Sequence, residues 1–297
     1  MTQLHIGMVG YGEVGKIFTA GLLPLVAQVS AWDHTFELPE RQAAERAHAA
    51  RAGVRTSASL PALCQQANLL ISAVTASNTL AVAQAAAPHL RAGMVFLDLN
   101  SASPGTKQQA AELIDAAGAH YVEAGVMTSV PPYGIRVPML LGGAHAEALA
   151  LTLRGLGMDA KAVSPDIGVA SAIKMCRSVM IKGLEALVIE SYTTARHYGV
   201  EAHMLATLAE TFPSIDWEKQ GAYFFSRVAQ HGKRRAEEMR EAANTVREAG
   251  FEPWMASAIA DKHDWVAQQS RNGVFDGLPQ PALWQDYADG LLSKSQL

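Results

Sequence analysis

The sequence has few cysteines and no long apolar run, and each shortage excludes a class of protein. The only cysteines among its 297 residues are Cys64 and Cys176. They are too few for a disulfide framework and lack the spacing of metal ligands. We expect both to be buried as small hydrophobic residues. No apolar run reaches the roughly 18 residues of a membrane span, and no signal-peptide pattern precedes the first strand. We therefore expect a cytoplasmic protein without a metal site.

Charge is scarce as well. Charged residues make up 18% of the chain, and the net charge is −4. Short basic clusters, such as Lys233 to Arg235, are interleaved with acids, unlike the continuous basic surface of a nucleic-acid-binding protein. The partner that we expect is a small molecule, not nucleic acid or a membrane.

A glycine motif lies close to the N-terminus. The apolar run from His5 to Val9 predicts a strand, an amphipathic helix follows, and Gly10, Gly12 and Gly15 between them have the spacing G-x-G-x-x-G. In a dinucleotide-binding βαβ unit, these glycines allow a tight turn, approach of the backbone to a pyrophosphate, and close packing of helix and strand. The phosphates then lie at the helix N-terminus. The predicted contacts are Gly10, Tyr11, Gly12, Glu13, Val14 and Gly15.

The end of the second predicted strand bears on the choice of cofactor. Asp33 closes the run QVSAWD. A carboxylate there accepts a hydrogen bond from the ribose 2′-OH of NAD and repels the 2′-phosphate of NADP. NAD is therefore favoured, while Arg41 and Arg46 in the next helix keep NADP open.

Strand and helix patterns alternate up to about residue 164, which predicts a Rossmann-type doubly wound parallel sheet. From Asp166 the pattern is helical only, with one long helix over about 167–198 and further helices near Glu201, Trp217, Arg234 and Trp254. We therefore predict an α/β fold with an all-α C-terminal domain. Residues 1–164 would form the NAD(P)-binding domain and residues 165–297 a helical domain for substrate and dimerisation.

The long helix carries a polar stripe. Ser171, Lys174, Ser178 and Lys182 recur at helical spacing and share one face. Such a stripe is either a solvated face or a face turned toward a ligand. Ligands of open α/β sheets bind outside the carboxyl ends of the strands, often where a second domain covers them, and this favours the second interpretation.

Several motifs together resemble a known family. They are G-x-x-G-x-G-x-x-G from Gly7 to Gly15, the segment LDLNSASP, the pair Gly142 and Gly143, and Gly168 followed by Lys174. In order and spacing they resemble the β-hydroxyacid dehydrogenases, which include 3-hydroxyisobutyrate and 6-phosphogluconate dehydrogenases. The C-terminal part resembles a branch in which a domain of unassigned function replaces the usual second half.

The resemblance implies oxidation of a hydroxyl β to a carboxylate with NAD or NADP. Lys174 matches the family's acid/base, and Ser178 stands where the family has an asparagine. Val74, Thr75 and Ser101 are further predicted cofactor contacts. A homodimer is also implied, and the apolar residues Met180, Leu184 and Leu187 of the long helix favour one.

The departures from the family concern the substrate. Met127, Thr128 and Ser129 replace a serine followed by two glycines, so an acidic substrate needs other donors. Arginine suits a carboxylate, although Arg234 and Arg235 could instead form surface ion pairs with Glu238. The predicted substrate contacts are Ser101, Thr128, Ser129, His231, Arg234 and Arg235.

The leading hypothesis is an NAD-dependent dehydrogenase acting on a small hydroxy acid. The alternatives are an NADP-dependent keto or imine reductase and a non-catalytic dinucleotide-binding protein. Imine reductases usually replace the lysine, and a non-catalytic protein could lose it, so Lys174 argues against both.

Overall fold

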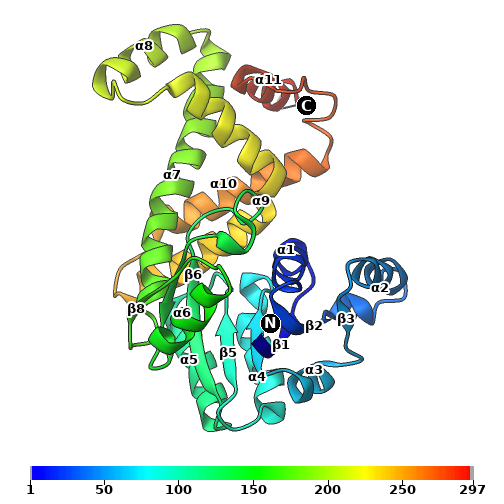
Figure 1. Ribbon diagram of the computed structural model, residues 1–297. Coiled ribbons are helices and arrows are strands. Elements are labelled where there is room, and N and C mark those ends of the chain that lie inside the picture. Colours follow the sequence, from blue (N-terminus) through cyan, green and yellow to red (C-terminus); the bar gives the residue numbers. More distant parts are fainter. Residues whose placement is uncertain (1, 295–297) are drawn as a thin grey trace. The chain divides into compact units, whose positions relative to one another are not determined.

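The computed structural model describes residues 2–294 and divides into two compact units, residues 1–175 and 176–297 (Figure 1). Strand β8 (Ala160–Ser164) ends at the predicted domain boundary, whereas the units part further on, inside helix α7 (Val169–Tyr198). Within residues 2–294, no helix has the length and apolar character needed to cross a membrane.

The first unit is built on one eight-stranded sheet with the order β3-β2-β1-β4-β5-β6-β7-β8. Its other strands are β1 (Thr2–Val9), β2 (Val26–Trp32), β3 (Arg55–Thr56), β4 (Leu69–Ser72), β5 (Val95–Asp98), β6 (His120–Val126) and β7 (Met139–Gly142). The order confirms the predicted Rossmann-type fold. One detail is wrong: β7 runs antiparallel to β6. The segment between them holds only the short helix η4 (Gly134–Arg136), and a parallel return needs a longer crossover.

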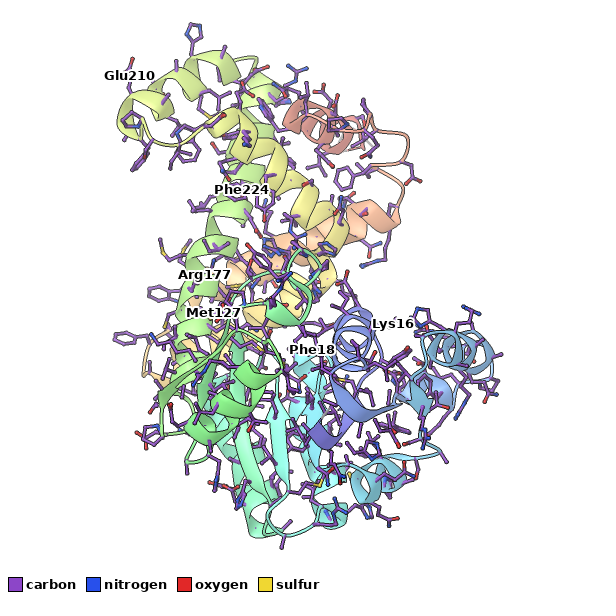
Figure 2. The ribbon with its side chains drawn as sticks, viewed as in Figure 1. Lys16, Phe18, Met127, Arg177, Glu210 and Phe224 are labelled. Atoms are coloured by element: carbon purple, nitrogen blue, oxygen red, sulfur yellow. The ribbon has the colours of Figure 1, made fainter. Side chains whose placement is uncertain are left out.

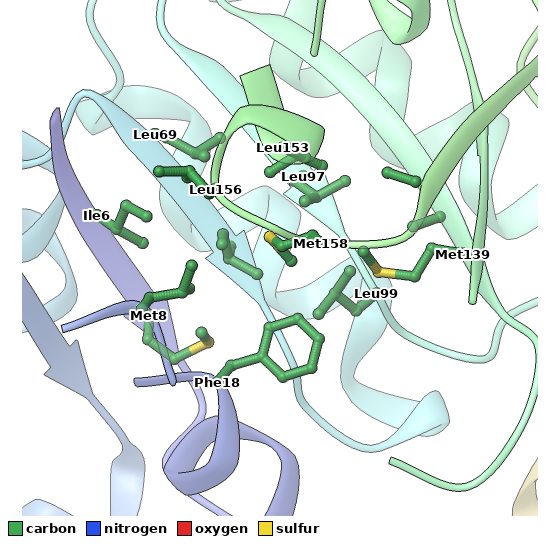
Figure 3. Packing of buried hydrophobic residues seen from close by; sticks show 14 of the residues in the cluster. Ile6, Met8, Phe18, Leu69, Leu97, Leu99, Met139, Leu153, Leu156 and Met158 are labelled. Atoms are coloured by element: carbon green, nitrogen blue, oxygen red, sulfur yellow. The ribbon is translucent and has the colours of Figure 1, made fainter. Parts of the chain in front are cut away.

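Helices cover both faces of this sheet, and each face has its own core. The helices are α1 (Glu13–Leu22), α2 (Gln42–Arg51), α3 (Leu60–Gln66), α4 (Thr79–Ala86), α5 (Pro104–Ala116) and α6 (Ala146–Gly155). Helices α1, α2 and α6 contribute to one buried cluster, and α3, α4 and α5 to the other. Figure 3 shows part of the first cluster. The strands therefore have apolar side chains on both faces, as parallel sheets do.

Successive side chains of β1 and β4 belong alternately to the two buried clusters. Met8 and Ile71 belong to the first cluster, and Val9 and Leu70 to the second. Phe18 and Lys16 both lie on α1 (Figure 2). Phe18 is fully buried in the first cluster, whereas Lys16 Nζ is paired with Glu45 Oε2 at 2.8 Å. This packing fixes the α1 N-terminus above the end of β1.

The second unit is helical, as predicted. After α7 come α8 (Glu201–Thr211), α9 (Trp217–Glu248), α10 (Trp254–Arg271) and α11 (Trp284–Lys294). Two predictions are corrected here: the helices expected near residues 217 and 234 are the single helix α9, and α11 was not expected. Gly232 lies inside α9, where this helix comes close to α10. A Cβ at this residue would lie 2.7 Å from the His263 carbonyl oxygen of α10, so a larger residue would not fit. The glycine thus allows close helix packing and does not end the helix.

The two cysteines differ in their surroundings. Cys64 is buried, and burial raises the pKa of its thiol to about 11. Cys176 is exposed on α7, so the prediction that both cysteines are buried is wrong for this residue.

Candidate active site

Four neighbouring parallel strands, in the order β2-β1-β4-β5, end at one edge of the sheet. Their ends lead into the segments that carry the predicted cofactor residues: the glycine motif after β1, Asp33 after β2, Val74 and Thr75 after β4, and Ser101 after β5. The chain reverses its strand order between β1 and β4. That reversal is where open α/β sheets bind ligands.

The glycine motif has the geometry that a dinucleotide needs. Gly10 has φ +96°, and a Cβ there would lie 2.4 Å from the Ala73 carbonyl oxygen. A Cβ on Gly15 would lie 2.1 Å from the Gly10 carbonyl oxygen. Among the described residues, a Cβ placed on Gly12 would meet no atom within 4 Å beyond Gly12 and its two neighbours in the chain, and no side chain caps α1 there. The helix N-terminus is thus open to a pyrophosphate, which fits a bound dinucleotide.

Asp33 ties the second strand to the glycine motif. Its Oδ2 accepts a hydrogen bond from the Tyr11 backbone N–H at 2.6 Å, and its Oδ1 accepts one from the Thr35 N–H at 2.8 Å. Burial by itself would raise the pKa of Asp33, but these donors outweigh burial, so the pKa is lowered. The group is a fixed carboxylate beside the glycine turn.

Arg41 and Arg46, the two arginines that could bind the 2′-phosphate of NADP, have other partners in the structure. Arg46 donates to the Phe36 carbonyl oxygen at 3.2 Å and to Thr56 Oγ1 at 3.3 Å. Arg41 is more exposed and lies 3.5 Å from Glu45. Neither contact involves the residues of the glycine motif.

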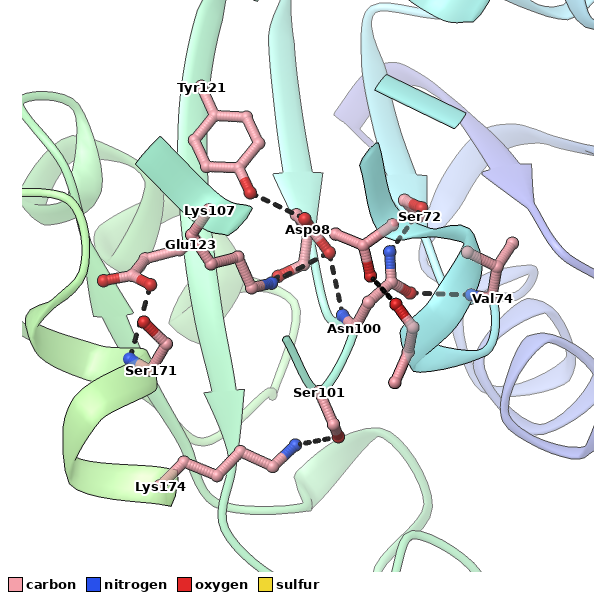
Figure 4. Close-up of polar contacts among 12 residues, drawn as sticks. Ser72, Val74, Asp98, Asn100, Ser101, Lys107, Tyr121, Glu123, Ser171 and Lys174 are labelled. Atoms are coloured by element: carbon pink, nitrogen blue, oxygen red, sulfur yellow. Dashed lines mark hydrogen bonds and ion pairs between the residues drawn. The ribbon is translucent and has the colours of Figure 1, made fainter. Parts of the chain in front are cut away.

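A buried polar network holds the segment after β5 (Figure 4). Asp98 Oδ1 pairs with Lys107 Nζ at 2.9 Å and accepts from the Asn100 N–H at 2.8 Å. Asp98 Oδ2 accepts from the Tyr121 hydroxyl at 2.6 Å, and burial together with the Asp98 charge raises the pKa of Tyr121. Asn100 Oδ1 in turn accepts from the Val74 N–H at 2.7 Å. The loops after β4 and β5 are therefore fixed to each other.

Lys174 reaches this segment from the first turns of α7. Its Nζ donates to Ser101 Oγ at 2.6 Å, and the side chain is partly buried (Figure 4). The structure thus brings together Lys174 and Ser101, which are far apart in the sequence. At this place a lysine in its neutral amine form can take the proton of a substrate hydroxyl, and as the resulting ammonium it can return the proton.

The other predicted substrate residues are distributed over both units. Met127 begins the loop after β6 (Figure 2), followed by the exposed Thr128 and the partly buried Ser129. In the second unit, Ser178 Oγ accepts from Lys182 Nζ at 3.3 Å.

The basic residues of α9 are engaged to different degrees. Arg235 forms a buried ion pair with Glu185, and Arg234 lies 3.9 Å from Glu238. The guanidinium of Arg235 is thus held within its own unit. His231 is partly exposed on the same helix, and its role stays a prediction.

The sequence analysis did not identify Asp98, Lys107 or Glu123. All three are fully buried. The available sign was a carboxylate inside an apolar strand, Asp98 in VFLD and Glu123 in HYVEAGV. A buried acid requires a partner, so each should have been marked as a polar anchor.

Comparison with known proteins agrees with this geometry. Residues 5–150 match the NAD binding domain of 6-phosphogluconate dehydrogenase, and residues 195–266 match a domain of unknown function, DUF1932. A conserved hypothetical protein from Sinorhizobium meliloti 1021 is 37% identical, with a TM-score of 0.77 over 98% of this chain and 97% of that one.

Two further structures are similar. One is a conserved protein of unknown function, described as structurally similar to 3-hydroxyacid dehydrogenases; it is 28% identical with a TM-score of 0.69 over 91% of this chain and 98% of that one. The other is 3-hydroxyisobutyrate dehydrogenase from Mycobacterium tuberculosis, with L-serine. It is 16% identical with a TM-score of 0.68, covers 98% of this chain and 99% of that one, and supports the fold alone.

The fold and the glycine motif define a dinucleotide-binding protein of the 3-hydroxyacid dehydrogenase type. The chain belongs to the β-hydroxyacid dehydrogenase family, in the branch whose C-terminal domain has no assigned function. The resemblance found in the sequence motifs is confirmed.

Proposed function

We propose that the protein is an NAD-dependent dehydrogenase that oxidises a small hydroxy acid, with Lys174 as the acid/base at the substrate hydroxyl. The observation that carries this proposal is the 2.6 Å contact between Lys174 Nζ and Ser101 Oγ. Ser101 follows β5, the strand next to β4 on the edge that also carries the glycine motif. A lysine at this edge suits a reaction in which a hydroxyl loses its proton.

The dinucleotide, Lys174, Ser101 and Ser178 have separate roles in the proposed reaction. When bound, the dinucleotide supplies the hydride acceptor. Lys174, as the neutral amine, takes the hydroxyl proton, and the positive charge that Nζ gains with this proton stabilises the developing alkoxide. Ser101 accepts a hydrogen bond from Lys174 and so orients its Nζ. Ser178 can only orient the substrate, because a neutral hydroxyl is a poor base.

The substrate is small and polar or acidic in this proposal. Met127 cannot donate the hydrogen bond that a serine would give, so Thr128 and Ser129 are the donors offered by the loop after β6. Arg234 and His231 remain proposed contacts. Arg235 is the weakest candidate because its guanidinium is bound to Glu185.

NAD is the proposed cofactor. Asp33 is a fixed carboxylate next to the glycine turn, and Arg46 is bound to Phe36 and Thr56. A 2′-phosphate would meet a negative charge there.

A homodimer is the proposed assembly. Met180 and Leu187 on α7 are 66% and 55% exposed in the single chain, and Leu184 is exposed at 36%. Burying such a stripe against a second copy would remove apolar surface from water. Leu187→Lys should lower the sedimentation coefficient to that of a monomer if this face is the interface.

The decisive experiment is a panel of hydroxy acids and polyols with NAD or NADP, followed by NADH or NADPH absorbance. With an active substrate, Lys174→Ala should lose about 10²–10⁴-fold in kcat while the dinucleotide binds with near-normal affinity. Lys174→Arg should recover little, since a guanidinium does not release its proton.

Lys161→Ala is the matched control, because Lys161 is an exposed lysine of the same unit. It should keep wild-type kcat. A Lys174→Ala enzyme with more than about a tenth of its activity would contradict the role of Lys174 and make His231 the next residue to test.

A further inference from the structure

Glu123 is a buried carboxylate that the proposed reaction does not use. It lies in β6 and is 0% exposed. Its Oε1 accepts from the Gly168 N–H at 2.8 Å and the Ala170 N–H at 3.0 Å, and its Oε2 accepts from the Ser171 N–H at 3.3 Å. These donors are the backbone N–H groups at the start of α7, so Glu123 caps that helix from a neighbouring strand (Figure 4).

A carboxylate is suited to this place. The first N–H groups of a helix have no partners within the helix, and the macrodipole favours a negative charge there. An acid from another element that binds three of these groups fixes the position and direction of the helix. A capping serine or asparagine from the helix's own chain segment would satisfy the N–H groups without tying the helix to the sheet.

The surrounding glycines make room for this arrangement. Gly142 of β7 pairs with Glu123 in the sheet, and a Cβ on Gly142 would lie 2.6 Å from Glu123 Oε1. Gly125, two residues along β6, has the same role toward the helix. A Cβ on Gly125 would lie 2.9 Å from the Ala170 carbonyl oxygen and 3.4 Å from Lys174 Cβ. Strand β6 and the first turns of α7 are therefore in direct contact up to Lys174.

We propose that Glu123 is a positioning residue: it binds the start of α7 to β6 and thereby sets the place of Lys174 Nζ at Ser101. Residues 168–174 belong to the first unit together with Ser101. The position of Lys174 relative to the dinucleotide-binding edge is then determined within this unit, by one carboxylate and two glycines. The inference rests on the proposed function for its effect on turnover, but its geometry can be tested without a substrate.

The first test measures the reactivity of Lys174. Wild type and Glu123→Gln are treated with acetic anhydride, and modification of Lys174 is followed over time by mass spectrometry. An amide in place of the carboxylate presents an N–H₂ group to backbone N–H donors and removes the charge, so the helix start loosens. Lys174 should be modified at least about threefold faster because its contact with Ser101 is lost as the helix start loosens. The modification rate of Lys16, another partly buried lysine of the unit, should be unchanged.

Gly142→Ala is the second variant, because its methyl group pushes against Glu123 Oε1 and leaves the carboxylate itself in place. It should raise the Lys174 reactivity in the same direction. Ser59→Ala is the matched control: Ser59 caps α3 in the same unit by accepting from the Ala62 N–H at 3.3 Å. This control loses a helix cap far along the chain from Lys174 and should leave the Lys174 reactivity unchanged.

The second test uses turnover, once a substrate is known. Glu123→Gln should lower kcat about 10- to 100-fold, as expected of a misplaced catalytic group, with an unchanged dissociation constant for the dinucleotide. In a Lys174→Ala background the same change should have no further effect on kcat. A merely structural residue would lower kcat in both backgrounds.

The outcomes separate the two proposals. If no substrate is found but Lys174 becomes more reactive in Glu123→Gln and Gly142→Ala, the positioning role is supported and the proposed function fails. If the reactivity of Lys174 is the same in wild type and both variants, or if Ser59→Ala raises it equally, the positioning role is overturned whatever the activity.

Discussion

Both units of the protein bury charged side chains, but the charges bind different kinds of partner. In the first unit, Glu123 accepts hydrogen bonds from three backbone N–H groups. Asp98 forms an ion pair with Lys107 and also accepts a hydrogen bond from the Asn100 N–H. In the second unit, Glu185 binds the Arg235 guanidinium, and Glu238 lies 2.8 Å from Lys182 Nζ. The acids of the sheet unit hold loops and helix ends, whereas the acids of the helical unit hold helix to helix.

This difference has a physical origin. Loops at strand ends have backbone N–H groups without partners in secondary structure, and a buried acid can satisfy them. Helices that pack side by side have no such groups along their length, so a buried acid must find a basic side chain. Loss of an acid should therefore lower the stability in both units but disturb the proposed site only in the first.

The largest effect is expected for Asp98→Asn. The Lys107 ammonium would be left fully buried without its carboxylate, and breaking such a pair costs about 3–5 kcal/mol. Urea unfolding followed by circular dichroism should show this loss in the free energy of unfolding. Glu112→Gln, an exposed acid on α5, should change it by less than about 0.5 kcal/mol. A similarly small change for Asp98→Asn would mean that the pair is not a stabilising anchor.

Glu185→Gln should come next, at about 2–3 kcal/mol, because the Arg235 side chain is 11% exposed and keeps some contact with water. Measuring kcat of this variant tests the difference between the two units. At temperatures where Glu185→Gln is folded, its kcat should stay within about twofold of the wild-type value. A fall in kcat as large as that of Glu123→Gln would remove the distinction between the two units.

His263 should make the free energy of unfolding depend on pH. It is fully buried, with neither ring nitrogen hydrogen-bonded among the described residues, and burial, aided by Arg235 and Lys182, lowers its pKa from 6.5 to about 3. Below pH 6.5 the unfolded chain takes up a proton that the folded chain does not, so the folded state loses stability as the pH falls. From pH 8 to pH 5 the loss should be about 2 kcal/mol.

His263→Met should flatten this pH dependence, measured by urea unfolding at several pH values. His203→Asn, which removes an exposed histidine of the same unit, should keep it. An equally steep dependence in His263→Met would assign it to other groups.

The smallest effect concerns the cofactor. NAD should bind several-fold more tightly than NADP, and Asp33→Ala should reduce this ratio by removing the charge next to the 2′ position. Fluorescence titration with both reduced dinucleotides measures the ratio. Equal affinity of the unmodified protein for NAD and NADP would contradict the role given to Asp33. Glu112→Gln, which removes the charge of an exposed acid on α5, should leave the ratio unchanged.

Local pattern was enough to predict the Rossmann-type fold, the glycine turn and the helical second half. Gly10, Gly12 and Gly15 have fixed spacing because the turn has fixed geometry, and the alternation of strands and helices implies a parallel sheet. These properties depend on neighbours in the chain. The sequence also marked Lys174 and Ser101 as residues to test, through their motifs.

The tertiary structure alone determined which residues meet. Ser101 and Lys174 are brought to hydrogen-bond distance by the order of the strands and the direction of α7. Local periodicity in the sequence encodes neither the strand order nor the helix direction. The same holds for Arg235, which the sequence offered as a substrate contact and which Glu185 binds. It holds most clearly for Glu123, an acid in an apolar strand whose partners are backbone groups of a distant helix. Backbone N–H groups are the same at every residue, so no sequence pattern names the helix that such an acid will cap.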